Sequence, residues 1–520
     1  MLIWFVILYL LLSIGIGLYA STRVHNAKDF AVAGRHLPLH IVTATVFATW
    51  FGAETVLGIS ATFVKEGLHG VVADPFGASL CLILAGLFFA NKLYRMNLLT
   101  IGDYYRLRYS RAVELITTVC IVLSYLGWVS AQIKALGLVF HVVSDDMVTQ
   151  QAGMLIGAAI VLTYTMFGGM WSVALLDFVQ MTVIMVGMAL IAVFISAKTG
   201  GFGAVVAHAQ STGKLDFFPR GDYTQWVPFI GAWVTMMLGS IPQQDVFQRI
   251  TSAKTEKIAV RGSVLGGSLY FLFAFVPMFL AYSATMIDPA VFGDLLEKDS
   301  QLVLPTLILH YTPAFMQVVF FGALLSAIMS CSSATLLAPS VAFTENILKH
   351  FVFKNMTDHQ FLRAMRLVVL GFGAVVLAFA LNSNASIFKM VENAYKVTLV
   401  AAFTPLAFGL YWKRANNQGA LAAIVMGLSS WILMETLAPE SITDIWPPQL
   451  VGLLMSIGGM IVGSLLPNLR GGVHAHHAAH HPHGHTAAHH GHEGHTAHDG
   501  HHEHHELLAH ELPAHRKHDA

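Results

Sequence analysis

The sequence predicts an all-α membrane protein that crosses the bilayer many times, and three observations support this prediction. Hydrophobic residues make up 55% of the 520 residues and charged residues only 11%, which is unlike an ordinary soluble domain. The apolar residues form about thirteen runs of roughly 18 to 28 residues, and about 20 suffice to cross the hydrocarbon core as a helix. Lys and Arg gather in alternate connections between these runs. We therefore predict a polytopic membrane protein with about 13 transmembrane helices.

The first apolar run is expected to be a true span. It lacks a basic segment before it, and Arg23 follows it where a signal peptide would have a small-residue cleavage site. Three cysteines, Cys81, Cys120 and Cys331, fall inside spans, so a disulfide framework is not indicated. The expected spans, in order, are 2–20, 38–64, 71–91, 114–142, 151–168, 172–197, 226–248, 262–286, 314–343, 366–383, 387–412, 417–437 and 448–467.

The distribution of positive charge predicts the orientation of the bundle. One set of alternate connections carries nineteen Lys and Arg residues, including the group from Lys92 to Arg111, whereas the opposite set carries five. Because cytoplasmic connections are enriched in Lys and Arg, we expect the N-terminus outside and the C-terminus in the cytoplasm of a cell-membrane protein.

The last fifty residues differ from the rest of the chain. Residues 474–518 hold 19 of the 28 histidines and few large apolar side chains, so we predict that 471–520 is a disordered, His-rich cytoplasmic tail. Clustered imidazoles can bind Zn²⁺ or Ni²⁺, with a merely solvated tail as the alternative. The candidate tail ligands are His501, His502, His504 and His505.

Ionisable residues inside the predicted spans are the first indication of function, because such groups are unfavourable in hydrocarbon unless they face protein, water or an ion. Eight of them are too many for an inert anchor: Glu54, Asp74, Lys134, Asp177, Asp245, Lys389, Glu392 and Lys396. No nucleophile–base arrangement or nucleotide-binding loop accompanies them, so an enzyme is not indicated.

Two spans have a composition suited to binding a cation. Gly52 and Gly58 interrupt the second span near its middle, and a broken helix frees carbonyls that can coordinate an ion; close helix packing is the alternative. The ninth span places Ser326 and Ser330 four residues apart on one face. Those hydroxyls suit sodium, but they can instead bond the carbonyl four residues back.

Five blocks of the sequence carry a family resemblance: Phe30–Arg35, Ala48–Glu54, Tyr164–Gln180, Gly239–Arg249 and Ser326–Asn346. They resemble the sodium/solute symporter family from about residue 28 to residue 427, and some are locally most similar to its high-affinity choline transporter branch. The resemblance implies a leucine-transporter-like fold, with two inverted five-helix repeats containing broken helices. The expected regions are 1–37 (first helix and cytoplasmic loop), 38–412 (transport core), 413–470 (two additional helices) and the tail.

The resemblance also implies a sodium site and an exit residue. The sodium ligands would be the carbonyls of Ala48, Phe51 and Ala327 and the hydroxyl of Ser330. Cys331 stands where the family usually has a second hydroxyl, and sulfur is a poor sodium ligand. Either four ligands plus water suffice, or Ser332 or Ser333 compensates, or coupling to sodium is weaker. Asp177 matches an aspartate thought to guide sodium inward; a salt bridge to an arginine is the alternative.

The substrate is less well defined by the sequence. Trp128 matches one position of the choline branch's aromatic cage, but Gln243 stands where that branch has tryptophan, so choline is not carried over. The expected pocket is polar and favours an amino acid or small amine, unless Lys134 neutralises a carboxylate or Glu54, Asp74 and Lys134 form a structural network. Its residues are Glu54, Asp74, Trp128, Gln132, Gln243, Gln244 and Asp245.

These features together predict a sodium-coupled symporter that imports a small organic solute by alternating access. A proton-coupled carrier of the same fold and a transporter-like sensor with a metal-responsive tail remain as alternatives. The expected partners are the solute and the lipid bilayer, with Na⁺ as coupling ion and no nucleic acid. The sequence leaves the oligomeric state open.

Overall fold

A computed structural model describes residues 2–351, 356–383 and 385–467 of the chain. The described residues are arranged almost entirely as helices, and their β-type pairing is one isolated bridge between Leu37 and Ala253. The long helices are α1 (Leu2–Ser21), α8 (Arg111–Val143), α9 (Gln150–Lys198), α13 (Glu256–Ile287), α16 (Ala314–Phe343), α18 (Asp358–Asn382), α21 (Asn417–Leu437) and α23 (Pro448–Leu465).

Other apolar segments are assembled from shorter pieces. One is α3 (Leu39–Trp50) followed by η2 (Glu54–Ile59) and α4 (Ser60–Glu66); another is α19 (Ile387–Thr398) with η8 (Leu399–Phe403) and α20 (Thr404–Tyr411). A third runs from Leu68 to Arg95 through η3 (Leu68–Val71), η4 (Val72–Gly77), α5 (Ala78–Leu84), η5 (Ala85–Ala90) and α6 (Asn91–Arg95). The shorter helices are α2 (Ala27–Val32), η1 (Ala33–Arg35), α7 (Ile101–Arg108), α10 (Phe202–Ser211), α11 (Tyr223–Gly239), α12 (Gln244–Ser252), α14 (Pro289–Asp299), η6 (Ser300–Leu302), α15 (Val303–Tyr311), η7 (Thr344–Leu348), α17 (Lys349–Phe351) and α22 (Glu440–Thr443).

The prediction of an all-α polytopic membrane protein is confirmed. Within the described residues, ten helical segments are long and apolar enough to cross a membrane, and the bent pair α3 and α4 makes an eleventh. α9 has 49 residues and leaves helical geometry at Gly169 (φ 49°, ψ −139°). At 1.5 Å per residue it would reach about 74 Å, more than twice the hydrocarbon thickness of about 30 Å. Counting its halves separately and joining α11 to α12 gives thirteen spans, a number that stays a prediction.

Two breaks interrupt the transport core. The axes of α3 and α4 differ by 54° at the first break, where Phe51 leaves helical geometry (φ −87°, ψ 76°). Gly52 is needed there, because an added Cβ would lie 2.9 Å from both the Cys331 sulfur and the Gln132 side-chain oxygen. α11 and α12 are separated by the second break, where Gln243 is extended and precedes the first turn of α12. The broken helices expected from the family resemblance are therefore present.

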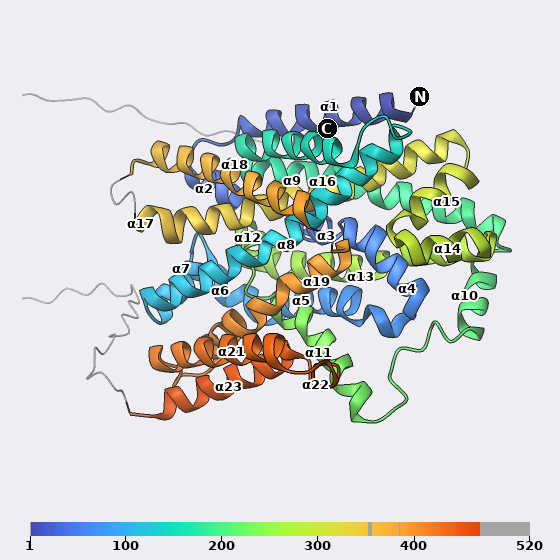
Figure 1. The fold of residues 1–520 in the computed structure, drawn as a ribbon. Coiled ribbons are helices and arrows are strands. Elements are labelled where there is room, and N and C mark those ends of the chain that lie inside the picture. Colours follow the sequence, from blue (N-terminus) through green and yellow to red (C-terminus); the bar gives the residue numbers. More distant parts are fainter. Residues whose placement is uncertain (1, 352–355, 384, 468–520) are drawn as a thin grey trace, which may run out of the picture. The chain divides into compact units, whose positions relative to one another are not determined.

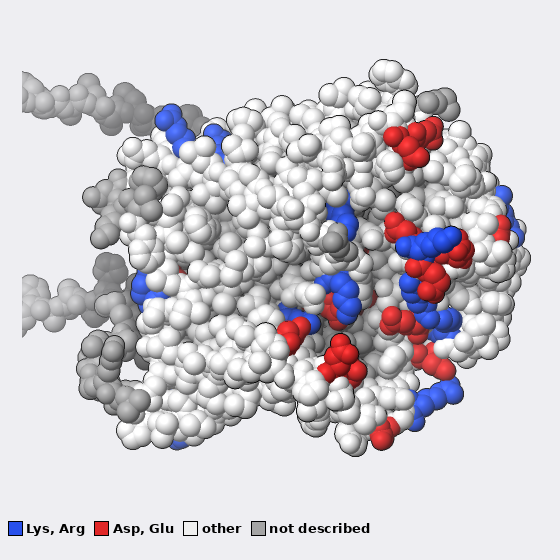
Figure 2. Space-filling model, in the orientation of Figure 1, with Lys and Arg blue, Asp and Glu red and all other residues white. Residues whose placement is uncertain are grey.

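The breaks lie inside a layer of long helices. α3 packs on α9, α13 and α16, while α8 packs on α9, α16 and α19 (Figure 1). α21 and α23 pack against each other beside this core. Figure 2 shows that charged side chains of the visible face gather toward the end where α4 and α14 lie, whereas the surface over α18, α21 and α23 is largely uncharged. This broad uncharged surface is what a bilayer requires.

Candidate substrate and sodium site

Glu54 is the centre of one buried polar group at the first helix break. Its carboxylate accepts hydrogen bonds from Trp128 Nε1 (3.0 Å) and Gln132 Nε2 (2.6 Å), and the Gln132 side-chain oxygen accepts from the Ala53 amide (3.0 Å). Cys331 Sγ lies 3.9 Å from Glu54 Oε1. The side chain is 2% exposed. The structure thus brings three predicted substrate residues together with one predicted sodium residue.

Aromatic rings from three helices pack beside Glu54. Trp50 of α3 lies edge-on to Trp128 of α8 at 5.4 Å and stacks on Tyr395 of α19 at 5.9 Å. The ring centroids of Tyr395 and Trp128 are 5.5 Å apart. The Tyr125 ring stacks on Trp128 with a centroid distance of 6.0 Å. We call Trp50, Tyr125, Trp128 and Tyr395 the ring cluster. Ring faces carry partial negative charge, so a ring cluster beside a carboxylate suits an organic cation.

Two predicted substrate residues lie apart from the Glu54 group. Asp74, in η4, accepts a hydrogen bond from the Tyr270 hydroxyl, which is also 3.1 Å from the Thr55 hydroxyl. Gln243 donates to Ser124 (3.0 Å) and Thr398 (3.3 Å). These hydrogen bonds use polar atoms of Asp74 and Gln243 that would otherwise be available to a solute.

The two residues after Gln243 face different neighbours. The Gln244 side-chain oxygen accepts from the Ile101 amide at 2.9 Å. Asp245 accepts a hydrogen bond from the Tyr125 hydroxyl, and its amide donates to the same hydroxyl at 2.9 Å. Oδ2 of Asp245 is buried without a partner among the described residues. Asp245 is therefore tied to the ring cluster, whereas Gln244 is not.

Lys134 does not neutralise Glu54. Its ammonium group donates to the carbonyls of Ala385 (2.7 Å) and Ser383 (3.3 Å). Among the described residues, no Lys, Arg or His nitrogen lies within 4.0 Å of the carboxylate of Glu54, Asp74, Asp177 or Asp245. The buried centre therefore has acidic groups without direct basic partners.

Asp177 is the centre of a second buried polar group. Its two carboxylate oxygens accept hydrogen bonds from Ser330 of α16 (2.5 Å) and from Thr45 of α3. Arg249 is nearby in α12 but donates to the Thr49 hydroxyl (3.1 Å) and to the Asp245 carbonyl (3.3 Å). Two hydroxyls and a carboxylate are hard oxygen donors of the kind sodium prefers, so the residues present fit that ion.

Ser330 stands out among the hydroxyls of α16. Ser326, Ser332 and Thr335 donate to the carbonyl four residues back, at 2.6 to 2.7 Å, and Ser333 donates to the Ser330 carbonyl at 3.0 Å. Ser326 also pairs with the Tyr9 hydroxyl at 2.5 Å. Most of these hydroxyls therefore donate their hydrogen bonds to carbonyls of their own helix. Ser330 alone of these five reaches the Asp177 carboxylate.

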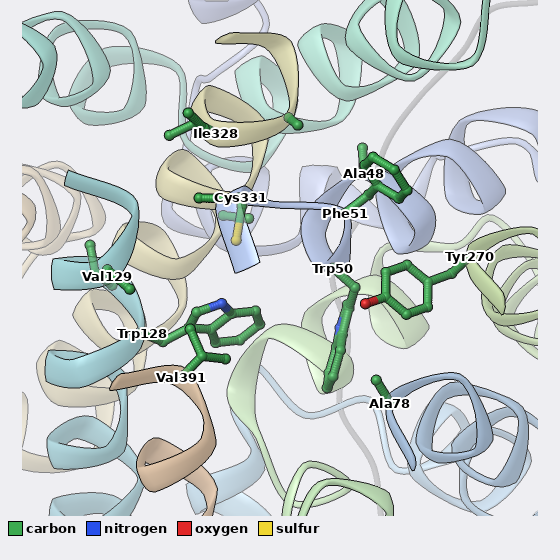
Figure 3. Packing of buried hydrophobic residues seen from close by; sticks show 14 of the residues in the cluster. Ala48, Trp50, Phe51, Ala78, Trp128, Val129, Tyr270, Ile328, Cys331 and Val391 are labelled. Carbon is green, nitrogen blue, oxygen red and sulfur yellow. The ribbon is translucent and has the colours of Figure 1, made fainter. Parts of the chain in front are cut away.

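The expected carbonyl ligands lie beside this group. A helix end removes the amide donors that the carbonyls of its last turn would otherwise meet, and Ala48 is in the last turn of α3 while Phe51 lies in the break. Ala327, by contrast, is inside unbroken α16. Figure 3 shows Ala48 and Phe51 next to the helix that carries Ile328 and Cys331, with Trp50 and Trp128 bordering the same interior region.

A polar vestibule leads toward the Glu54 group from the side predicted to be outside. It has a volume of about 570 Å³ and is bordered by α4, α11 and α19. The residues that line it include Gly58 and Val72, and Gly58 is one helical turn from Glu54 along the chain. Lys389 and Glu392 line it and form a 2.9 Å ion pair. The four residues of the ring cluster are not among those that line the vestibule.

The predicted tail ligands, from His501 to His505, lie outside the described residues. Within the described ranges, no group of three or more His, Cys, Asp or Glu side chains is arranged to hold a metal ion. Metal binding by the tail therefore stays a prediction.

Three of the residues that build the site were missed in the sequence. Trp50 lies within the Ala48–Glu54 block, but the pocket predicted from the sequence does not include its ring. Tyr125 and Trp128 are three residues apart and Gln132 follows four later, which places all of them on one face of α8. That spacing could have identified Tyr125. Tyr395 carries no such local signal, because its partners come from other helices.

The broken helices and the buried polar groups beside them define a secondary transporter rather than an enzyme. A sequence model of the sodium:solute symporter family matches residues 30–427. The chain belongs to this family, and the predicted resemblance is confirmed.

Relatives with known roles are similar over most of their length. The high affinity choline transporter 1 of Homo sapiens is 28% identical, with 81% of this chain and 75% of the relative covered. The sodium/proline symporter of Haemophilus influenzae is 25% identical, with 87% and 92% covered.

Solved structures support the leucine-transporter-like fold. A substrate-bound, outward-open Na⁺-coupled sialic acid symporter superposes with a TM-score of 0.76 at 18% identity, covering 89% of this chain and 97% of the other. The transporter MhsT in complex with L-phenylalanine gives a TM-score of 0.51 at 12% identity, covering 82% and 98%.

Proposed function

We propose that this sodium-coupled symporter carries a small organic ammonium compound, either an amino acid or a small amine, with Glu54 as the group that faces the ammonium. The observation that carries this proposal is the Glu54 carboxylate, buried without a direct basic partner and bordered by the ring cluster. A buried carboxylate is strongly unfavourable unless a cation or a proton balances it. The substrate's ammonium group supplies that balance.

The ring cluster supports the same substrate class. Trp50, Trp128 and Tyr395 pack on one another beside the Glu54 carboxylate, so a cation that binds this carboxylate would also lie close to aromatic rings. Glu54 adds an acceptor for N–H groups, which favours a protonated amine over a quaternary ammonium that has no N–H to donate. The relatives named for choline and for proline bracket this range of chemistry.

Coupling to sodium follows from the proximity of the two polar groups. Ser330 bonds Asp177, and the next residue, Cys331, lies beside Glu54. A sodium ion held by Ser330, Asp177 and the carbonyls at the end of α3 would fix the bend between α3 and η2. Because Glu54 begins η2, sodium would order the substrate's binding group and raise substrate affinity.

The test is ligand-induced thermal stabilisation of the purified protein. The panel contains amino acids, primary and quaternary amines and carboxylates, each in sodium and in potassium. We expect an ammonium compound to stabilise the protein in sodium, by about 2.7 kcal/mol at a concentration of 100 times its Kd. Glu54→Gln should reduce the shift to about 0.9 kcal/mol or less at the same concentration, because binding is expected to be about thirtyfold weaker, and Ser330→Ala should reduce the sodium dependence of the shift. Glu440→Gln, in an exposed helix turn, is the control and should leave it unchanged.

Two results would contradict the proposal. If compounds without an ammonium group stabilise the protein and Glu54→Gln still responds to them, Glu54 is not the recognition group. If a ligand binds equally in sodium and potassium, and remains unaffected by Ser330→Ala, the sodium assignment fails.

A further inference from the structure

A large apolar hollow lies away from the Glu54 group, at the surface of the helix layer. It is a groove of about 870 Å³ between α8, α16 and α18, three helices that pack on one another (Figure 1). Its walls are almost entirely apolar, and Arg363 and Gln360 are the polar exceptions among the residues that line it. The apolar lining includes Val122, Phe343, Leu367, Val368, Phe372 and Val375.

Two residues explain why this surface is hollow. Pro339 lies inside α16 and lines the groove, and an internal proline weakens the helix and bends it. Gly371 of α18 faces the groove with no side chain, and a Cβ added there would meet nothing within 4 Å. The groove is therefore built into the backbone rather than left by one displaced side chain.

Arg363 gives the groove one charged end. Its side chain is exposed and makes no hydrogen bond or ion pair with any other described residue. The neighbouring Arg366 differs, because its guanidinium donates to the Phe167 carbonyl at 3.2 Å. Arg363 is thus a cation without a counter-ion in the part of the chain that the structure describes.

The groove is long enough for one lipid chain. From Gln360 to Val375 the helix rises about 22 Å, at 1.5 Å per residue, which exceeds the roughly 15 Å of one hydrocarbon leaflet. Arg363 is in the second turn of α18, on the side predicted to be cytoplasmic. Anionic lipids are concentrated in that leaflet, and basic side chains attract them.

We propose that this groove is a binding site for an anionic phospholipid. The phosphate pairs with Arg363, with Gln360 as a second donor, and one acyl chain lies along α18 past Gly371 between α8 and α16. The charge complementarity favours an anionic lipid over a zwitterionic one, because Arg363 has no ion-pair or hydrogen-bond partner among the described residues. The site is separate from the Glu54 group and does not depend on the substrate proposed above.

The experiment is native mass spectrometry of the full chain in detergent, with phosphatidylglycerol and phosphatidylcholine of identical acyl chains in competition. We expect a retained one-to-one adduct that prefers phosphatidylglycerol. Arg363→Gln should lower this preference about fivefold, the effect of about one basic residue at a membrane surface. Arg261→Gln is the matched control, because Arg261 is also exposed and without an ion pair among the described residues.

A second variant tests the acyl groove. Gly371→Leu fills open space and favours the helix over glycine, so the protein should keep its thermal unfolding midpoint while the retained adduct of either lipid is lost. Gly458→Leu on α23 also enters open space and should leave the adduct intact. The proposal is overturned if phosphatidylcholine binds as well as phosphatidylglycerol, if Arg363→Gln leaves the preference unchanged, or if Gly371→Leu retains the adduct.

Discussion

Two regions of the molecule bury acidic side chains, and they treat the charge in opposite ways. At the start of α8, Glu114 is fully buried and faces Arg111 at 2.8 Å and Arg106 at 3.8 Å, with Asn346 donating a further bond at 2.9 Å. At the helix breaks, Glu54 is equally buried but receives bonds from Trp128 and Gln132, which are uncharged.

The presence or absence of a basic partner distinguishes the structural role of Glu114 from the proposed transport role of Glu54. Where the protein supplies its own cations, the buried acid locks neighbouring segments together, and Glu114 joins α7, α8 and η7 in this way. Around Glu54 and Asp177 no basic side chain of the described residues is a direct partner, and under the function proposed above the substrate's ammonium group and sodium would balance the charge. The buried acid without an ion pair is therefore the better guide to a ligand.

The largest expected effect is on stability at the paired region. Glu114→Ala leaves Arg106, Arg111 and Asn346 without their shared acceptor, and breaking a buried ion pair costs about 3 kcal/mol or more. Both arginines are about one third exposed, so hydration should keep the loss near that lower value. The thermal unfolding midpoint should fall. An unchanged midpoint would show that this network does not hold α8 in place.

The opposite outcome is expected for Glu54→Gln. Glutamine keeps the side chain's size and can still accept from Trp128, so the unfolding midpoint should change little. Substrate binding should weaken about thirtyfold or more, since a hydrogen bond to a charged group contributes about 2 kcal/mol. Equilibrium binding of the identified ligand measures this. If the variant unfolds as readily as Glu114→Ala, the contrast between the two regions is wrong.

A smaller effect should separate sodium from substrate within the unpaired region. Ser330→Ala removes a donor to Asp177, and we expect sodium affinity to fall about tenfold, equivalent to about 1.4 kcal/mol. The readout is the sodium concentration that gives half-maximal stabilisation by substrate. Ser332→Ala is the matched control, because Ser332 bonds its own helix. Equal losses in both variants would mean that the contact with Asp177 has no special role.

The smallest effect is expected in the vestibule. Lys389 is well exposed where it pairs with Glu392, and an exposed ion pair contributes less than about 1 kcal/mol. Lys389→Met should leave the unfolding midpoint and the substrate Kd nearly unchanged in physiological salt. A large change in Kd would make this pair part of the binding site and extend the unpaired region outward.

The sequence predicts the fold better than it predicts contacts. Apolar runs and glycines at positions 52 and 58 are local features, and the first helix break occurs where they indicated. The partner of Asp74 is Tyr270, 196 residues away along the chain, and no spacing rule connects two such positions. The contacts among Trp50, Trp128 and Tyr395 are not predictable from spacing for the same reason, because these rings come from three helices.

Helix geometry explains which of the polar residues meet. Trp128 and Gln132 are four residues apart and share a face, whereas Lys134 is two residues further and points elsewhere, to the carbonyls of Ser383 and Ala385. An interaction between Lys134 and Glu54 would require Lys134 to share the helix face of Trp128 and Gln132, which its position two residues after Gln132 does not allow. The consecutive residues Gln243, Gln244 and Asp245 likewise diverge around the start of α12 to three different neighbours.

The vestibule also shapes the electric field across the protein. Water conducts ions, so a membrane voltage falls mainly over the part of the protein that water does not enter. Gly58, one helical turn from Glu54 along the chain, lines the vestibule, so in the predicted orientation we expect most of the voltage to fall between the vestibule and the opposite surface, across the region that holds Asp177 and Ser330. One elementary charge crossing 100 mV gains about 2.3 kcal/mol. If sodium binds there as proposed, the ion would complete most of its electrical path on leaving, so voltage would drive its release far more than its entry.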